Sequence, residues 1–532
     1  MSLYLSPPKV VLVAVELACK ADVDSLAALA AQYDAVLHKE LLLRILLTYL
    51  PANLRTADYV SLVQEAESGE FTQLAPVDID ASRIQHLSDE EVTKRVRKLR
   101  LRKLAWPDAP KNLSEDTLTL FLISRAYAVD AGAGSLSELP ALLAPFLDHS
   151  PYIRTWTVST LLPLLRRNFE YHPRRPISEG LSSFERQPDR VAVSLLLSET
   201  GQRDDDLASI GRDLRGLVGP WLHNSRRWTT AENPPGQDGP SARPSTSAST
   251  QSPCPGWEEV LQWLTAQASK SWRVAVGAVE QWDGPADVDL GGYGTMWLVD
   301  EEQAYLEKRY ARAAMASAYL IPESSEEALV GAYNIATKIA DLLDQDPSPS
   351  LAIASSLLSP IPDLASSGIL LSQNTTYLRN DMLEEANILT TPSKATTILL
   401  HALVLSAFVL SRAGCPCTVR RAGELALLQN EREQKAEAAR LIRSLGENAP
   451  PKGDDKYWMR ARDETLWLKD WGAEESSESS ESSSLPPCMG VLGQVKREFL
   501  ETEILKALLA NTRGSPPTAL LPCFPGGDSD PG

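Results

Sequence analysis

The stretch KELLLRILLTYL, residues Lys39–Leu50, decides the fold. On a helix its leucines and isoleucine leave only four polar positions for water, so the apolar surface is wider than a single stripe. A helix of this kind needs neighbours on more than one side. Pro51 removes a backbone donor and clashes with the preceding turn, which predicts that the helix stops there. Such helices, repeated with short breaks, are typical of stacked helical arrays.

The residues around this stretch continue the same pattern. Helices are predicted over 7–20, 22–33, 35–50 and 56–67, and their short breaks favour antiparallel neighbours. No strand-like alternation bounded by hairpin turns lies between them. The sequence therefore predicts an all-α fold, an α-solenoid of stacked antiparallel helix pairs with disordered linkers. Further helices are predicted over 89–104, 118–130, 136–147, 152–171, 191–197, 207–222, 257–282, 295–320, 326–343, 391–412, 419–445, 456–471 and 495–511.

The composition indicates folded blocks that are joined by unfolded spacers. Of 532 residues, 43% are hydrophobic and 23% charged, as in folded proteins, whereas 37 prolines and 29 glycines indicate unfolded parts. The formal net charge of −18 argues against a nucleic-acid partner. The six cysteines are too few and too scattered for a disulfide scaffold, which favours a reducing compartment.

Two compositional shifts set the expected domain boundaries. The run TTAENPPGQDGPSARPSTSASTQSPCPG cannot bury enough apolar surface to offset its ordering entropy, and AEESSESSESSS is an acidic serine spacer. The expected organisation is an N-terminal helical block over 1–228, a Pro/Ser-rich linker over 229–256, a second helical block over 257–472, an acidic linker over 473–487, a terminal helix over 488–513 and a disordered tail over 514–532.

One predicted helix is strongly basic in an acidic chain. Ser88 and Glu91 fit a capping box that opens a helix expected to run from Asp89 to Leu104. One interpretation is a docking surface for anionic lipid or an acidic partner. The other is a solvated face that balances acidic neighbours, as most charge runs do. The candidate residues are Lys94, Arg95, Arg97, Lys98, Arg100, Arg102 and Lys103.

No residue pattern indicates catalysis or metal binding. The six histidines stand far apart and form no HExxH or Cys/His motif. Cys415-Pro416-Cys417 lacks the two-residue spacer of a redox motif, so a tight interhelical turn is the better interpretation. His401 lies on an apolar helix and is interpreted as a satisfied interior or interface residue. The sequence thus predicts a non-enzymatic protein without cofactor, metal site or small-molecule substrate.

No membrane-spanning segment is predicted. The most apolar later run, Ile398–Leu410, has thirteen residues, short of the roughly 20 that a spanning helix needs. We therefore expect any membrane association to be indirect, through partners or a surface.

Five longer strings carry a family resemblance: IRTWTVSTLLPLLRRNFEYHP (153–173), IGRDLRGLVGPW (210–221), SWRVAVGAVEQWDGPADVDLGGYG (271–294), RAGCPCTVRRAGELALLQNEREQKAEAARLI (412–442) and GQVKREFLETEILKALLAN (493–511). They resemble the fungal secretory-pathway family sometimes called Sec-thirty-nine. The likeness runs from about Leu5 to Arg513 and skips the Pro/Ser linker and the acidic serine run.

The resemblance implies an α-solenoid related to the metazoan neuroblastoma-amplified-sequence protein. Such a protein is a scaffold of a Dsl-type tethering complex, peripheral on the cytosolic face of the endoplasmic reticulum. Its implied partners are the other tethering-complex subunits, endoplasmic-reticulum SNAREs and, indirectly, COPI vesicles in Golgi-to-ER retrograde transport. The family pattern implies further helices after Thr512, where this sequence has a low-complexity tail.

Three alternatives stay open. The chain could be a generic α-solenoid adaptor outside secretion, or a peripheral membrane binder that uses residues 94–103. It could also be an enzyme whose site is assembled by folding around Cys415, Cys417 and a distant histidine.

Overall fold

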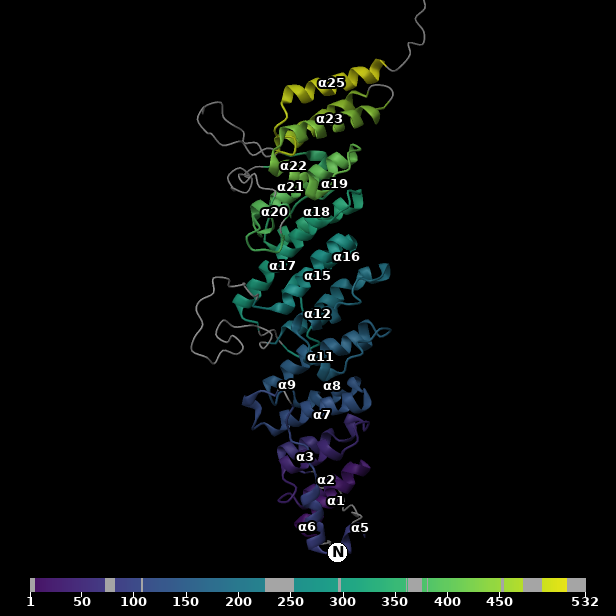
Figure 1. Cartoon of the computed structure of the whole chain (residues 1–532), viewed down its shortest axis with the longest axis vertical. Helices are drawn as coiled ribbons and strands as arrows, with labels where there is room; N and C mark the ends of the chain where they lie inside the picture. The colour runs from purple at the N-terminus through teal and green to yellow at the C-terminus, as the bar shows by residue number, and fades with distance from the viewer. Residues whose placement is uncertain are drawn as a thin grey trace, which may run out of the picture. The chain divides into compact units, whose positions relative to one another are not determined.

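The computed structural model describes residues 5–71, 82–106, 109–224, 253–294, 298–359, 361, 376–379, 381–450, 454–471 and 490–513. Over these ranges the chain is helical and contains no strand. It divides into two units: unit 1 takes 1–202, 212–260 and 287–298, and unit 2 takes 203–211, 261–286 and 299–532. Within each unit, helices stack on their neighbours (Figure 1). The predicted all-α helical-repeat fold is therefore confirmed.

The helices of unit 1 are α1 (Pro7–Lys20), α2 (Val23–Gln32), α3 (Lys39–Tyr49), α4 (Val60–Ser68), α5 (Ser82–Gln85), α6 (Asp89–Lys98), α7 (Thr117–Ala133), α8 (Leu139–Leu143), α9 (Pro151–Trp156), α10 (Leu162–Leu165), α11 (Leu181–Glu185), α12 (Asp189–Leu196), the second half of α13 (Ile210–Asp213), α14 (Gly219–Leu222) and the start of α15 (Pro255–Lys270).

Helix α3 carries the stretch that decides the fold. It contacts α1, α4 and α7, and its central leucines and isoleucine are buried, as its wide apolar surface predicts. The helix begins at Lys39, so the predicted start at Ala35 is wrong. The cause is His38, whose Nδ1 accepts a hydrogen bond from the Leu41 amide at 3.4 Å and caps the helix.

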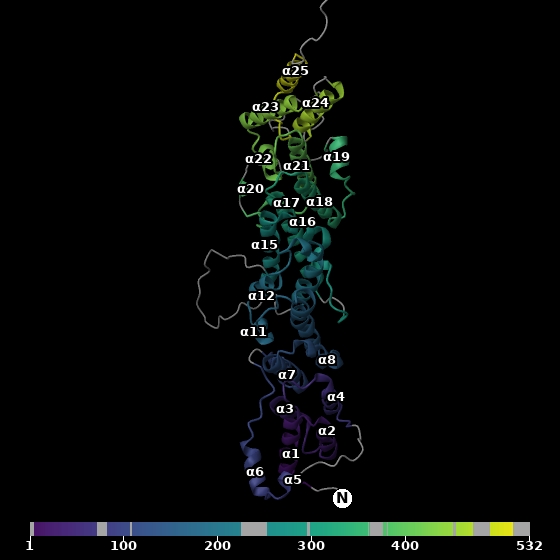
Figure 2. The same cartoon turned by 90° about the vertical axis from the view of Figure 1, so that its right-hand side faces the viewer.

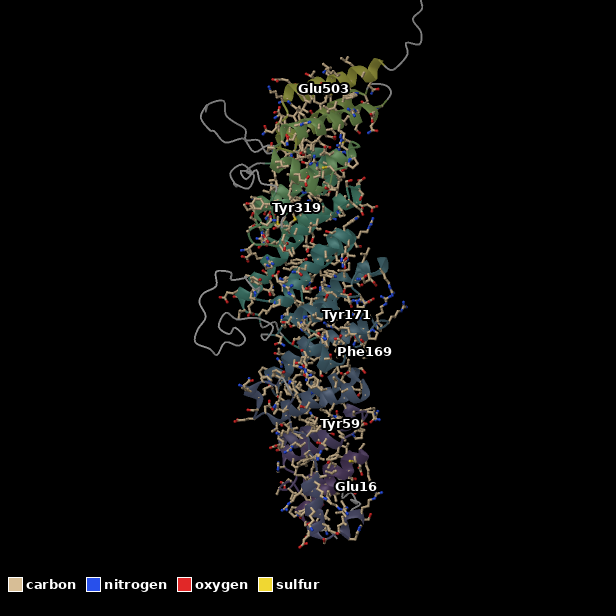
Figure 3. All side chains as sticks on the ribbon, in the orientation of Figure 1. Glu16, Tyr59, Phe169, Tyr171, Tyr319 and Glu503 are labelled. Carbon is tan, nitrogen blue, oxygen red and sulfur yellow. The ribbon has the colours of Figure 1, made fainter. Side chains whose placement is uncertain are left out.

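A buried arginine holds the turn after α3. From α7, the guanidinium of Arg125 donates to the carbonyl oxygens of Leu50 at 2.9 Å and Pro51 at 2.7 Å. It also donates to the Tyr59 hydroxyl at 3.2 Å (Tyr59 is labelled in Figure 3). These bonds satisfy carbonyls that the end of a helix leaves without partners.

The run after Pro151 continues as helix through Pro163 and is not divided there. Five residues at Thr157–Leu161 and six at Arg166–Tyr171 form π-helical turns on either side of α10, which carries the proline. A proline lacks the amide that would bond four residues back, and wider turns let the helix accommodate that loss.

The helices of unit 2 are the first half of α13, the rest of α15, α16 (Trp272–Gln281), α17 (Asp300–Leu320), α18 (Glu326–Leu342), α19 (Leu351–Leu357), α20 (Thr376–Arg379), α21 (Lys394–Arg412), α22 (Val419–Leu428), α23 (Glu431–Glu447), α24 (Asp455–Asp470) and α25 (Arg497–Arg513).

Helix α21 forms the centre of unit 2 and contacts α18, α19 and α22. It has 19 residues and is long and apolar enough to cross a membrane by length and composition alone. The thirteen-residue run Ile398–Leu410 that was considered in the sequence is therefore shorter than the helix that contains it. However, 72% of its most apolar window is buried inside the protein, as in the core helix of a folded domain.

Several predicted boundaries in unit 2 are wrong. The helix predicted over 419–445 is two helices, because Gln429 adopts a left-handed φ of 49° and the Asn430 side chain caps α23. The helix predicted over 257–282 breaks at Ser271. Helices α19 and α20 were not predicted.

The predicted domain boundaries stay predictions. The Pro/Ser-rich linker (except for its last four residues), the acidic serine run and the C-terminal tail all lie outside the described residues.

Candidate functional site

The seven basic residues predicted from the sequence lie on two different local structures. Lys94, Arg95, Arg97 and Lys98 belong to α6, which ends at Lys98, so the predicted helix to Leu104 is wrong. Arg100, Arg102 and Lys103 follow on a non-helical segment that starts with Leu99 at φ −64° and ψ 125°. We call the seven residues together the basic surface.

The backbone after α6 leaves the helix because α3 holds it. The Arg102 amide donates to the Thr48 hydroxyl at 2.9 Å, and Nε of Arg44 donates to the Arg102 carbonyl at 3.2 Å. Three leucines of this segment, at 99, 101 and 104, are half-buried, whereas the three basic side chains are exposed. This alternation of apolar and basic residues is what an extended segment packed on a helix requires.

Helix α6 is itself fixed to α1 at the N-terminal end of unit 1 (Figure 2). The Ser88 hydroxyl accepts from the Glu91 amide at 3.3 Å, which is one of the two hydrogen bonds of the predicted capping box. Asp89 accepts a hydrogen bond from the Ser6 hydroxyl at 2.8 Å and lies 3.7 Å from Lys9 of α1. The basic surface therefore rests on a supported backbone along its whole length.

A buried cluster in unit 1 has the residue types of a catalytic triad. The Asp213 carboxylate, 1% exposed, lies 2.6 Å from His172 Nε2 and accepts from the Thr200 hydroxyl at 3.1 Å. It is also paired with Arg212 at 2.7 Å. In a triad the histidine stands between nucleophile and carboxylate. Here the carboxylate stands in the middle, so the arrangement fits cross-linking of three segments and not activation of Thr200.

The two cysteines at the predicted interhelical turn are buried and carry no metal-site geometry. The turn follows Gly414, whose φ is 89° and whose missing Cβ leaves room for the Ser444 hydroxyl. Burial raises the pKa of Cys417 to about 12, and nearby Glu437 adds to the effect. A thiol with so high a pKa is a poor nucleophile at neutral pH. Among the described residues no three His, Cys, Asp or Glu side chains gather as metal ligands would.

His401 is a satisfied interior residue, as interpreted from the sequence. Its Nδ1 lies 3.1 Å from the Thr397 carbonyl, which can only accept, so this nitrogen carries the proton. Nε2 lies 3.3 Å from the Thr337 hydroxyl, and the ring packs edge-on against Tyr333 at 4.8 Å. Burial lowers the pKa of His401 to about 4.

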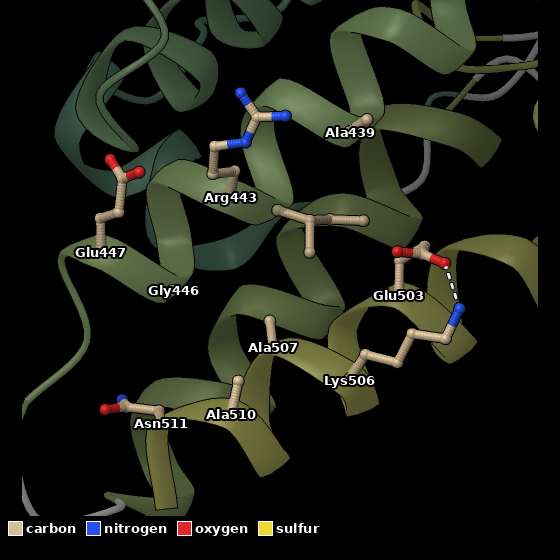
Figure 4. Close-up of a pocket in the computed structure, with 10 residues that line it drawn as sticks. Ala439, Arg443, Gly446, Glu447, Glu503, Lys506, Ala507, Ala510 and Asn511 are labelled. Carbon is tan, nitrogen blue, oxygen red and sulfur yellow. Dashed lines mark hydrogen bonds and ion pairs between the residues drawn. The ribbon is translucent and has the colours of Figure 1, made fainter. Parts of the chain in front are cut away.

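A cavity of about 540 Å³ lies between α23 and α25 in unit 2 (Figure 4). Small residues form much of its wall, among them Gly446 and Ala507, where a Cβ added at the glycine would lie 3.7 Å from the alanine Cβ. Lys506 and Glu503 pair within it at 2.7 Å and neutralise each other. The residues that line this cavity include no nucleophile beside a base. The cavity is therefore better suited to receiving another side chain than to catalysis.

A second cavity, of about 640 Å³, lies in unit 1 beside Phe169. The Phe169 ring is 49% exposed at the end of the second π-helical turn (labelled in Figure 3). The polar groups in its wall are engaged: Asp130 accepts from the Leu181 amide at 2.6 Å, and Asn168 accepts from the Ile177 amide at 2.7 Å. They support the loop that shapes the cavity.

The sequence matches the model of a known protein family. A family model described as secretory pathway protein Sec39 matches residues 11–516, nearly the whole chain. No curated protein matches the sequence.

Proposed function

The chain belongs to the Sec39 family of secretory pathway proteins, and from that premise we propose that it is a non-enzymatic scaffold subunit of a vesicle-tethering complex at the endoplasmic reticulum. The observation that carries the proposal is the family match over residues 11–516, on a chain whose described part is a stack of helices. In this role it acts in Golgi-to-ER retrograde transport, peripherally on the cytosolic face of the membrane.

A scaffold of this kind works by presenting surfaces and performs no chemistry of its own. It links the capture of COPI vesicles to endoplasmic-reticulum SNAREs, with other tethering-complex subunits as direct partners. Binding both sides at once raises their effective concentration, which can strengthen capture without any new contact. The absence of a nucleophile–base pair in the sites described above is consistent with this role.

Stacked helices offer partner helices both grooves and exposed faces. Two exposed apolar pairs at helical spacing occur in the described part of unit 2: Ile353 and Leu357 on α19, at 52% and 65% exposure, and Leu505 and Leu509 on α25, at 53% and 47%. Exposed apolar side chains in pairs of this kind are found where proteins meet other proteins.

The proposal is tested by affinity purification of the tagged full chain from a gentle detergent lysate, followed by mass spectrometry. Recovery of tether subunits together with endoplasmic-reticulum SNAREs is the expected result. If a folded chain co-purifies reproducibly with a different set of proteins, the generic adaptor function replaces the tethering one.

Two matched variants sharpen the experiment. Leu505→Asp with Leu509→Asp changes the pair on α25, and Ile353→Asp with Leu357→Asp changes the pair on α19. Both place two charges on exposed positions and leave the core unchanged. Loss of partners from one variant alone assigns the contact to that helix, because the other variant controls for added charge.

A further inference from the structure

None of the seven cations of the basic surface forms an ion pair within the described part of the chain. All seven side chains are exposed. Glu90 and Glu91 precede Lys94 and Arg95 by four residues, the spacing of a helical ion pair, yet over the described ranges none of the seven cations pairs with a carboxylate. Seven like charges within ten residues repel one another, so a binding partner that supplies negative charge is favoured.

Helix electrostatics account for part of the surface only. The first turn of α6 is acidic, and its last turn holds Arg95, Arg97 and Lys98. Cations at that end are stabilised by the helix dipole. Arg100, Arg102 and Lys103 lie beyond the helix on the extended segment, where the dipole no longer acts. These three side chains point outward because the leucines between them are half-buried. The extended segment therefore continues the charged surface of α6 independently of the helix dipole.

The surroundings favour a membrane over a peptide as the partner. Peptide recognition needs a groove, a pocket or an open strand edge. None of the seven residues lines the cavities on α23–α25 or beside Phe169, and the Arg102 backbone is already bonded to α3. No large apolar side chain in 82–106 is among the exposed ones, so the surface offers charge without an apolar anchor. A high density of positive charge is enough for binding to a bilayer of anionic lipids.

We propose that the basic surface binds the headgroups of anionic phospholipids on a membrane. Four of its seven residues are arginines, whose guanidinium groups bind phosphate oxygens in pairs. Since the chain as a whole carries a charge of −18, the rest of the protein is repelled by the same membrane, and the contact is confined to the end of unit 1 that carries α6. The surface thus gives the protein a direct and orienting membrane contact.

The inference does not depend on the proposed tethering function, because it is tested with the purified full chain alone. Co-flotation is measured with vesicles of phosphatidylcholine and with vesicles of phosphatidylcholine mixed with phosphatidylserine. The chain is expected to float with the anionic vesicles only, and rising salt is expected to release it because exposed charges are screened.

The decisive comparison uses two quadruple variants with equal changes in net charge. One carries Lys94→Gln, Lys98→Gln, Arg100→Gln and Lys103→Gln in the basic surface. The other carries the same change at exposed cations of unit 2, namely Lys270→Gln, Lys308→Gln, Arg432→Gln and Lys456→Gln. Each cation near an anionic surface strengthens binding about fivefold, so the first variant is expected to bind roughly 10²–10³-fold more weakly. The second is expected to bind like the original protein.

Circular dichroism of both variants shows whether the helices are kept. The inference is overturned if the original chain does not float with anionic vesicles at low salt, or if the two folded variants bind equally well. A chain that ignores the vesicles but binds a poly-glutamate peptide through these four residues would also overturn it, in favour of an acidic protein partner.

Discussion

Arg312 of α17 offers the sharpest test of how unit 2 is held together. Its guanidinium is 2% exposed and donates to the carbonyl oxygens of Glu384 at 2.8 Å and Asn387 at 2.9 Å, and to the Thr390 hydroxyl at 3.0 Å. Two longer bonds reach the Glu385 carbonyl at 3.3 Å and the Thr391 hydroxyl at 3.2 Å. One side chain therefore bonds to five residues of the connection that precedes α21, which includes the short 3-10 helix Ile388–Thr390.

Replacing this arginine by methionine keeps most of its length but removes every donor. A net hydrogen bond contributes about 1 kcal/mol, and bonds from a charged donor contribute about 1.5–3 kcal/mol. Five such bonds would sum to more than the loss of stability that we expect. The net loss is smaller because burial of the cation costs free energy in the folded protein, and because water reaches some of the carbonyl oxygens that lose their donor. We therefore expect Arg312→Met to lower the free energy of unfolding of unit 2 by about 3–5 kcal/mol. The free energy of unfolding of Arg312→Lys should lie between those of the original protein and of Arg312→Met, because lysine keeps donors but has fewer of them, at a single point.

The assay is urea unfolding followed by circular dichroism, with hydrogen exchange at residues 381–391 as the local measure. Since the chain has two units, the exchange data show which unit responds. Lys308→Met is the matched control, because Lys308 is an exposed cation on the same helix. A midpoint for Arg312→Met that equals the control, with unchanged exchange at 381–391, would refute the reasoning.

Three further predictions rest on local geometry. The free energy of unfolding should fall as the pH drops from about 6.5 to about 4, because His401 takes up a proton in the unfolded state but resists protonation where it is buried in the folded state. In urea melts, His401→Leu should show a smaller fall over this pH range. The same dependence on pH in both proteins would contradict this. Gly414→Ala should destabilise by about 1–2 kcal/mol through its left-handed φ, whereas Gly446→Ala should be neutral or stabilising by up to about 1 kcal/mol in the same melts. Peptide mass spectrometry after alkylation of the native chain should find Cys19 modified well before Cys415–Cys417, because only Cys19 of these is exposed. Equal rates would show that the turn opens readily.

Much of the fold could be predicted because helix periodicity and capping are local signals. The bounds of α1 agree with the prediction to the residue, and α18 differs by one residue at its end. Several errors arose where a helix breaks without proline or glycine. At Gln429 the break depends on a left-handed residue followed by the Asn430 cap, and the second of these could have been recognised in the sequence.

The candidate site shows the same limit more clearly. The sequence identified its seven basic residues but placed all of them on one helix, because the run from Asp89 to Leu104 contains no breaker. What ends α6 is the bonding of the Arg102 backbone to Thr48 and Arg44 of α3, more than fifty residues away. A contact at that separation leaves no local trace. The alternation of leucine with basic residues after Lys98 was the one available sign.

Net charge is also a coarse guide to the charge at the protein surface, because some arginines of this protein are buried and others are exposed. Arg125 and Arg312 are buried and donate to carbonyls of connecting segments, and buried Arg166 donates to the carbonyl of Gly216 in a π-helical turn at 3.0 Å and to that of Asp289 at 2.6 Å. A helical array needs such donors, since every helix end leaves carbonyls without partners and a guanidinium carries five N–H groups. These arginines add to the formal charge but contribute little to the surface. The cations at 94–103 are therefore a larger share of the accessible positive charge than the sequence suggests, which strengthens the case that they bind something outside the chain.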